Sequence, residues 1–383
     1  MDWPSAVARA QRIVHGCADP KPERLVAHGA HLVFGEARLL DAHTVEAAGE
    51  RITADHILIA TGRRPPRPPI PGIEHAVTHV EALEWTEPPR RLAVIGGGVI
   101  GMEFAYLFRR VGSEVRVFET LDHILYMLDG DVRDTIAQHA IGLGIGLHTA
   151  ARVLEIARMG DERRLRVHVG SGQIDVTVDQ VLVAAGQAPA VDGLGLEAIG
   201  VTFDRGGIET DATLRTTVPT VWAAGDVRKG APALSQVASH EGALAARNAL
   251  TGAGREIAER IVPFLIGLTP PAAGVGLTEA QARTLSPDVG VHHQTYAEVC
   301  PAANVDGEPE GFVKVIFEAS TGKLLGAQAF GARSPELMQQ FAFALHAGMT
   351  ISQGAEALFV FPGISEVLWY ALRPRPGDQD GRK

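Results

Sequence analysis

Residues 91–108 read RLAVIGGGVIGMEFAYLF, and this stretch decides the fold. Residues 91–95, apolar after Arg91, predict a buried strand, and the apolar periodicity of 99–111 predicts a helix directly after a glycine-rich turn. A second strand is expected at 114–118. Strand, Gly-x-Gly-x-x-Gly turn, helix and strand in this order are typical of a dinucleotide-binding βαβ unit.

Each glycine of the turn has a physical role in that unit. Gly96 makes the tight turn, Gly98 lets the backbone approach a pyrophosphate, and Gly101 permits close helix packing. The helix N-terminus offers partial positive charge to the phosphates. A carboxylate at the end of the second strand suits the ribose hydroxyls of NAD, whereas Arg116 inside that strand leaves NADP open. The cofactor-binding residues predicted here are Gly96, Gly98, Val99, Ile100, Gly101 and Glu119.

The composition bounds the class of protein. The 383 residues are 46% hydrophobic, and 45 Asp and Glu against 35 Lys and Arg give a net charge of -10. We expect two or three globular domains and no nucleic-acid partner, because no basic run offers a phosphate-binding surface. No run approaches the ~18 apolar residues of a membrane span, and the N-terminus has no signal-peptide pattern. We therefore expect a cytoplasmic protein with no membrane partner.

Two other segments repeat one plan. Residues 35–65 and 149–189 each predict a short antiparallel meander, a buried strand, then Ala-Thr-Gly or Ala-Ala-Gly with a proline three residues on. Two copies predict two related nucleotide-binding domains. The spacing from Gly96 to Ala184, measured back from Ala60, falls before Met1, so we expect the chain to begin inside its first domain.

A third signal lies at residues 220–250. It predicts a strand, a Gly-Asp turn at Gly225 and Asp226, and a helix from about Pro232. A carboxylate at a strand end beside a helix N-terminus suits a cofactor with hydroxyls and an electron-rich ring edge, as a flavin has. The alternative is a simple N-capping aspartate. His240 and Glu241 in the helix are interpreted as solvated or capping residues, and the arginines of 63–72 as solubilising linker residues.

Together these residues resemble the class I pyridine nucleotide-disulfide oxidoreductase family, which includes mercuric reductases, dihydrolipoamide dehydrogenases and glutathione reductases. The resemblance spans about residues 2–372, and the motifs that carry it are ILIATGRRP, VIGGGVIGMEFA, VLVAAGQAP, WAAGDV, AAGVGLTEAQA and GFVKVIFEASTGKLLGAQAFG. It implies FAD and NAD as cofactors, with NADP open, and hydride transfer between nicotinamide and flavin. It also implies a homodimer that reduces a small-molecule or protein electron acceptor.

The resemblance implies an α/β fold with two Rossmann-like nucleotide-binding domains, the first truncated, and a C-terminal α+β dimerisation domain. The expected FAD-binding domain comprises 1–90 and 196–258. The NAD(P)-binding domain comprises 91–195, and the dimerisation domain comprises 259–383.

Further site residues follow from the resemblance. Asp226 would hold the flavin ribityl hydroxyls, Ser235 would lie where a backbone amide meets the flavin pyrimidine, and Glu103 would lie beside the nicotinamide and flavin rings. The other residues expected to line the cofactor sites are Thr61, Gly62, Ala185, Gly186 and Gly225.

The sequence also departs from the family. The FAD fingerprint and the Cys-x-x-x-x-Cys redox pair would precede Met1, and Cys17 and Cys300 are too far apart to replace the pair. The C-terminal general base, a histidine in disulfide reductases, is replaced by Phe361, although Glu366 keeps the spacing of its carboxylate partner. Phenylalanine carries no proton. Glu103 and Glu366 remain the catalytic candidates, and no metal site is predicted.

Three hypotheses therefore stand. The first is an FAD- and NAD(P)H-dependent oxidoreductase with an undetermined final acceptor, and this is the primary interpretation. The second is a catalytically inactive, NAD-binding dimeric relative. The third is a truncated gene product that folds poorly, because a parallel sheet without its first strand would expose apolar edges.

Overall fold

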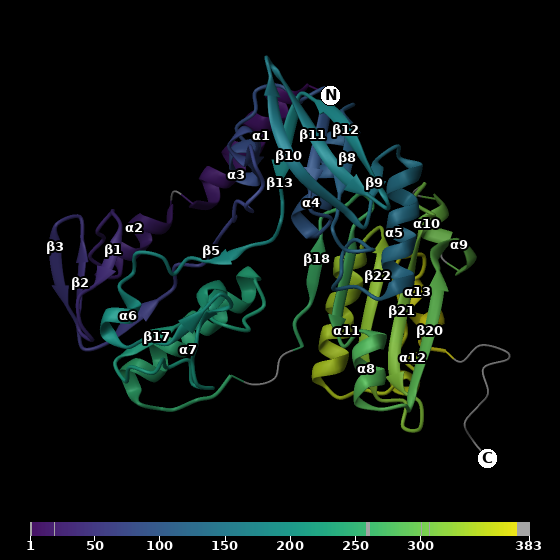
Figure 1. Ribbon diagram of the computed structural model, residues 1–383. Coiled ribbons are helices and arrows are strands. Elements are labelled where there is room, and N and C mark those ends of the chain that lie inside the picture. The colour runs from purple at the N-terminus through teal and green to yellow at the C-terminus, as the bar shows by residue number, and fades with distance from the viewer. Residues whose placement is uncertain (1, 19, 258–260, 300, 306, 374–383) are drawn as a thin grey trace. The chain divides into compact units, whose positions relative to one another are not determined.

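The computed structural model describes residues 2–18, 20–257, 261–299, 301–305 and 307–373, and Figure 1 traces their helices and strands. The chain divides into two units. The first contains Met1–Arg67, Leu83–Glu87 and Gly186–Glu259, and the second contains Pro68–Ala82, Pro88–Ala185 and Arg260–Lys383.

The first unit consists of small sheets and three longer helices. The first repeat forms the antiparallel meander β1-β2-β3, and its buried strand β4 pairs in parallel with β17, which places Ile57 opposite Val221. These strands share an apolar core with β16, whose Ile208 is fully buried. The elements are α1 (Trp3–Ala18), α2 (Pro20–Ala27), β1 (Ala37–Leu39), β2 (Thr44–Ala47), β3 (Glu50–Thr53), β4 (Ile57–Ile59), β5 (Arg63–Arg64), β14 (Ala188–Pro189), α6 (Leu196–Ile199), β15 (Phe203–Asp204), β16 (Gly207–Ile208), β17 (Val221–Ala223), η2 (Gly225–Val227) and α7 (Ser235–Thr251).

The second unit begins with a five-stranded parallel sheet of order β6-β13-β7-β8-β9. Leu92 to Ile95 of β7 are all buried, as expected for the central strand of a parallel sheet. The second repeat forms the meander β10-β11-β12 beside it. The elements are η1 (Ile73–His75), β6 (Val77–Thr78), α3 (His79–Ala82), β7 (Arg91–Ile95), α4 (Val99–Arg110), β8 (Glu114–Phe118), α5 (Gly130–Gly142), β9 (Gly146–His148), β10 (Ala151–Met159), β11 (Glu162–Val169), β12 (Gly172–Val178) and β13 (Gln180–Val183).

The same unit continues into a five-stranded antiparallel sheet of order β18-β19-β22-β21-β20. Helices α11 and α13 pack against this sheet around Met338 and Val367, which are fully buried. The elements are β18 (Phe264–Ile266), β19 (Ala272–Gly276), α8 (Glu279–Leu285), β20 (Val289–Thr295), α9 (Tyr296–Val299), α10 (Pro301–Val305), β21 (Gly311–Glu318), β22 (Leu324–Gly331), α11 (Ser334–His346), α12 (Ile351–Ala355) and α13 (Glu366–Ala371).

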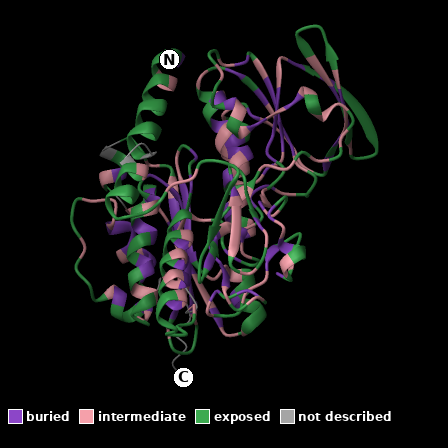
Figure 2. Ribbon diagram, turned by 90° about the vertical axis from the view of Figure 1, so that its left-hand side faces the viewer, coloured by how far each residue is buried: buried purple, intermediate pink, exposed green. Residues whose placement is uncertain are grey.

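The predicted fold class is confirmed. The strand, helix and strand expected at 91–95, 99–111 and 114–118 are β7, α4 and β8. The α/β part with its parallel sheet is followed in the chain by an antiparallel sheet, which lies in the residues that match a dimerisation domain. Buried residues concentrate in the strands and on the inner faces of the helices, whereas α1 is largely exposed (Figure 2). No helix in the described ranges is both long and apolar enough to cross a membrane.

Candidate functional site

The fingerprint turn between β7 and α4 is closed by backbone contacts that only glycine permits. Gly96 has φ +108, and a Cβ added there would lie 2.4 Å from the carbonyl oxygen of Ala184. A Cβ on Gly101 would lie 1.9 Å from the carbonyl oxygen of Gly96. The glycines at these two positions therefore let β7, β13 and α4 approach one another, and Ala185 follows directly beside the turn.

Gly98 has a different environment. It is the N-cap of α4, contributes no side-chain cap, and an added Cβ would have nothing within 4 Å among the described residues. The space beside this position is open and adjoins the first turn of α4, and the N-terminal N–H groups of a helix can bind anions. Val99 and Ile100, the first residues of α4, are half-buried. This arrangement fits a pyrophosphate.

Glu119 lies at the end of β8, and both of its carboxylate oxygens accept hydrogen bonds. Oε2 accepts the N–H of Gly97 at 2.6 Å, and Oε1 accepts the N–H of Leu121 at 2.8 Å. The carboxylate is thus fixed beside the fingerprint turn. Arg116, in contrast, donates to Glu114 on the same strand at 2.9 Å. The strand therefore offers a positioned carboxylate and a guanidinium already engaged by another acid.

Glu103 projects from the second turn of α4. Its Oε1 accepts the N–H of Gly267 at 2.7 Å, so a backbone group just after β18 holds the carboxylate. This hydrogen bond gives Glu103 a fixed position just beyond Gly101, the last glycine of the fingerprint.

Around Asp226 the first unit forms a polar site. Oδ1 of Asp226 is buried and has no hydrogen-bond partner among the described residues. Gly225 has φ +71, and a Cβ there would lie 2.9 Å from Cβ of Ala238, so the turn packs directly on α7 near its first residue, Ser235. Leu234, the N-cap of α7, supplies no side-chain cap. An unpaired buried acceptor beside an uncapped helix N-terminus fits a ligand that donates hydroxyls, and the residues present therefore fit FAD.

The turn that carries Asp226 is held by residues whose roles the sequence did not reveal. Glu241 accepts the N–H of Gly225 at 2.9 Å and binds Arg228 through two hydrogen bonds, of 3.1 Å and 2.6 Å. Glu241 is only 1% exposed, so the interpretation of Glu241 as a solvated or capping residue is wrong. Arg63 donates from Nε to the carbonyl oxygen of Asp226 at 2.9 Å, which also corrects its interpretation as a solubilising linker residue.

The two Ala-x-Gly segments of the repeats lead into a common ladder. The Thr61 hydroxyl donates to the carbonyl of Ala190 at 2.8 Å, and the carbonyl of Gly62 accepts the N–H of Ala190 at 2.9 Å. β5 and β14 then pair in antiparallel register. Gly186 has φ +93 and nothing near an added Cβ. Since Arg63 follows Gly62, this ladder is connected to the turn of Asp226.

Glu366 lies in a separate element, at the start of α13. It is 7% exposed, and its Oε2 is buried with no hydrogen-bond partner in the described part of the chain. Phe361 is 70% exposed, as are its apolar neighbours Leu358, at 100%, and Val360, at 73%. The segment before α13 therefore presents an apolar surface.

Among the described residues there is no group of three or more His, Cys, Asp or Glu side chains that could hold a metal ion. Cys17 is a free, exposed thiol on α1, and Cys300 lies outside the described residues.

Comparisons with known proteins define the class. Residues 9–242 match the profile of the pyridine nucleotide-disulphide oxidoreductases, and residues 262–372 match the dimerisation domain of the same group. The chain belongs to the pyridine nucleotide-disulphide oxidoreductase family. Members of this family use FAD and NAD(P)H.

Individual relatives agree with this family assignment. The chain is 34% identical over 348 residues to the mercuric reductase of Bacillus cereus, which covers 90% of this chain and 55% of that protein. It is 33% identical over 344 residues to the mercuric reductase of Staphylococcus aureus, covering 89% and 62%. The chain thus spans less than two thirds of the length of these two relatives. Among solved structures, the HOCl-induced flavoprotein disulfide reductase RclA from Escherichia coli matches with a TM-score of 0.89 and 29% identity, over 97% of this chain and 86% of that one.

Proposed function

We propose that this protein is an FAD- and NAD(P)H-dependent oxidoreductase that transfers a hydride between nicotinamide and flavin. The observation that carries the proposal is the buried Oδ1 of Asp226, which has no hydrogen-bond partner in the described part of the chain and lies on a turn that Arg63 and Glu241 hold in place. Leaving such an acceptor unsatisfied costs about 1–3 kcal/mol. A cofactor hydroxyl that donates to Oδ1 would remove that cost, and FAD supplies both this hydroxyl and the ring that accepts the hydride.

The chain's own residues divide the work of binding. Asp226, with Ser235, Thr61 and Gly62 nearby, would hold the flavin half of FAD. The N-terminus of α4 would hold the pyrophosphate of the nicotinamide cofactor.

The carboxylate of Glu119 would accept from the ribose hydroxyls and repel a 2′-phosphate, which favours NAD. Glu103 would lie beside the nicotinamide, where the N–H of Gly267 fixes its carboxylate.

The segment before α13 bears on which electron acceptors are possible. Phe361 offers no proton, and Leu358 and Val360 beside it are apolar and exposed. We propose a small-molecule or protein acceptor whose reduction needs no proton from the side chain of residue 361. A disulfide acceptor is disfavoured, because disulfide reductases use a histidine at this position. The match to a dimerisation domain supports a homodimer. A cytoplasmic location, without membrane or nucleic-acid partners, remains part of the proposal.

The test is the visible absorption spectrum of the purified chain with and without FAD, followed by addition of NADH. We expect flavin bands that bleach with NADH. The variant Asp226→Ala should bind FAD about 10- to 150-fold more weakly, because a hydrogen bond to a charged group contributes ~1.5–3 kcal/mol. Asp204→Ala, which removes an exposed carboxylate of the same unit, is the matched control.

Two results would contradict the flavin proposal: no FAD binding by the wild-type chain, or equal FAD affinity in Asp226→Ala and Asp204→Ala. A colourless dimer that binds NADH would instead support the second candidate, a catalytically inactive NAD-binding relative. That candidate is favoured by two observations: Phe361 cannot act as a base, and Oε2 of Glu366 has no partner among the described residues.

A further inference from the structure

The fingerprint turn is braced by the segment that follows Glu119. The N–H of Leu125 donates to the carbonyl of Gly97 at 3.0 Å, while the N–H of Gly97 donates to Glu119 at 2.6 Å. Cγ2 of Ile124 lies 2.8 Å from where a Cβ on Gly97 would be. Gly97, in the middle of the fingerprint, is therefore held on both of its backbone polar groups by residues 119–125.

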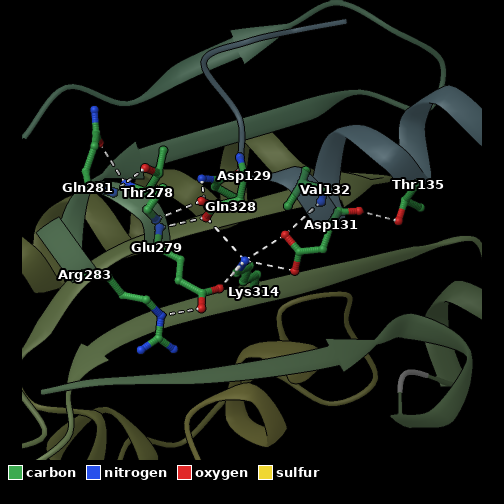
Figure 3. Close-up of polar contacts among 11 residues, drawn as sticks. Asp129, Asp131, Val132, Thr135, Thr278, Glu279, Gln281, Arg283, Lys314 and Gln328 are labelled. Atoms are coloured by element: carbon green, nitrogen blue, oxygen red, sulfur yellow. Dashed lines mark hydrogen bonds and ion pairs between the residues drawn. The ribbon is translucent and has the colours of Figure 1, made fainter. Parts of the chain in front are cut away.

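The far end of this segment is anchored at Asp129, which is 5% exposed. Its carboxylate accepts the N–H groups of Glu279 at 2.9 Å and Ala280 at 3.2 Å, and the side-chain amide of Gln328 at 3.0 Å (Figure 3). Gln328 also accepts the N–H of Asp129 at 3.1 Å. These partners lie on α8 and β22. The segment that braces the fingerprint therefore ends at α8 and at the antiparallel sheet β18-β19-β22-β21-β20, called the dimerisation sheet below.

Lys314 on β21 lies at the centre of this cluster and is 1% exposed (Figure 3). Its Nζ lies 2.8 Å from Asp131, 2.8 Å from Glu279 and 3.4 Å from Asp129. Burial acts to lower the pKa of Lys314, but the hydrogen bonds that its ammonium donates to Asp131 and Glu279, together with the charges of Asp129 and Asp131, outweigh burial and raise the pKa above its usual value. The ammonium is therefore a permanent positive charge that ties α5 and α8 to β21.

We propose that Lys314 is a positioning residue for the nicotinamide cofactor: by holding Asp129 and Asp131, it fixes the segment 119–129 that braces Gly97. The inference rests on the proposed function, because the fingerprint must bind NAD(P)H for the brace to matter. It makes cofactor affinity depend on an ion cluster in the dimerisation sheet. Mutations within such a network change coupling by about 0.5–2 kcal/mol.

The test measures NADH and NADPH affinity of the full chain by fluorescence titration for wild type, Lys314→Met and Lys314→Arg. We expect Lys314→Met to weaken binding of the preferred nucleotide by about 2- to 30-fold. Lys314→Arg should recover part of the loss, because it keeps the charge. The matched control is Lys323→Met, which removes an exposed lysine from the hairpin of β21 and β22. Where activity is measurable, the loss should fall on KM rather than kcat.

A second measurement needs no cofactor. In Lys314→Met, amide hydrogen exchange should speed up in residues 119–129 and remain unchanged in the meander 151–178. Should Lys314→Met fail to fold, Asp131→Asn, at a half-exposed position, takes its place in both measurements. If hydrogen exchange in residues 119–129 and nucleotide affinity both stay as in wild type, the inference about Lys314 is wrong, whereas the proposed function still stands. A wild-type chain that binds neither nucleotide overturns the proposed nicotinamide site, and exchange then decides whether Lys314 fixes the segment.

Discussion

The carboxylate of Glu119 and the N–H of Gly97 are joined by a hydrogen bond of 2.6 Å across the fingerprint turn. The other oxygen of Glu119 accepts from Leu121 at 2.8 Å and from Thr120 at 3.1 Å. A carboxylate has about four acceptor positions, so about one is left for a ligand. The group expected to meet the ribose is thus already oriented, and a hydrogen bond joins the turn to the strand end.

Two glycines of this turn should respond differently to the same added methyl group. In Gly98→Ala the new Cβ meets nothing within 4 Å, so the free energy of unfolding should stay within about 1 kcal/mol of wild type while NADH binding is lost. In Gly101→Ala the new Cβ would lie 1.9 Å from the carbonyl oxygen of Gly96, so both folding stability and binding should fail. Urea unfolding and NADH titration of the two variants measure the contrast.

Gly112→Ala is the control for glycine replacement outside the turn, since it has open space but φ +101 and should lose stability without a specific loss of NADH binding. If Gly98→Ala bound NADH as tightly as wild type, the cofactor would not approach the turn at this position.

The sequence predicted the elements around β7 because periodicity and glycine spacing act locally. A buried strand, a helix period and a turn that requires φ above zero can each be recognised within about twenty residues. The same local reasoning singled out Asp226, whose chemistry depends on its own strand end. The ladder of β5 with β14 was not predicted, because it joins residues far apart in the chain.

The residues that hold the site in place could not be predicted in this way. Glu241 and Arg63 belong to residue types that usually lie at the surface. Only the packing of α7 and β5 against the turn of Asp226 reveals their partners. Lys314 lies 183 positions from Asp131 in the chain. Lys314 is flanked by apolar residues of β21, but its sequence gives only a weak signal of burial, since its three carboxylate partners come from other segments.

Stability should fall as the pH is lowered through the range where histidine titrates. Burial, with a smaller contribution from Arg116, lowers the pKa of His148 below its ordinary value of 6.5, and burial also lowers the pKa of His79 and of His139. Below pH 6.5 the unfolded chain therefore binds more protons than the folded chain, and the free energy of unfolding decreases until the lowered folded-state pKa values are passed. Above that window these histidines add no pH dependence.

Urea unfolding at pH 7.5 and at a series of lower pH values checks this prediction. In His148→Gln the free energy of unfolding should decline less steeply with falling pH than in wild type, whatever the stability at pH 7.5, because one of the histidines with a lowered pKa is gone. His168→Gln, at an exposed position on β11, should leave the slope as in wild type. A slope that is the same in both variants would show that His148 does not contribute.

The buried ion pair of Glu241 with Arg228 should matter more to the fold than its exposed counterparts, because removal of one partner leaves a charge in the interior. The side chains are 2% and 14% exposed. Glu241→Ala should lower the free energy of unfolding by about 3–5 kcal/mol, whereas Arg215→Met, which breaks an exposed pair with Asp211, should cost about 0–1 kcal/mol.

The double variant Glu241→Leu with Arg228→Met distinguishes an unpaired charge from lost packing. Apolar side chains of similar size restore the contacts of the pair without its desolvation cost. Stability should therefore recover in part and stay about 1–3 kcal/mol below wild type, because the buried N–H of Gly225 loses its acceptor. FAD affinity should stay reduced in the double variant, because Gly225 has lost the acceptor that orients the turn of Asp226. If the double variant were as unstable as Glu241→Ala and yet bound FAD normally, the pair would serve the core of the first unit and not the cofactor turn.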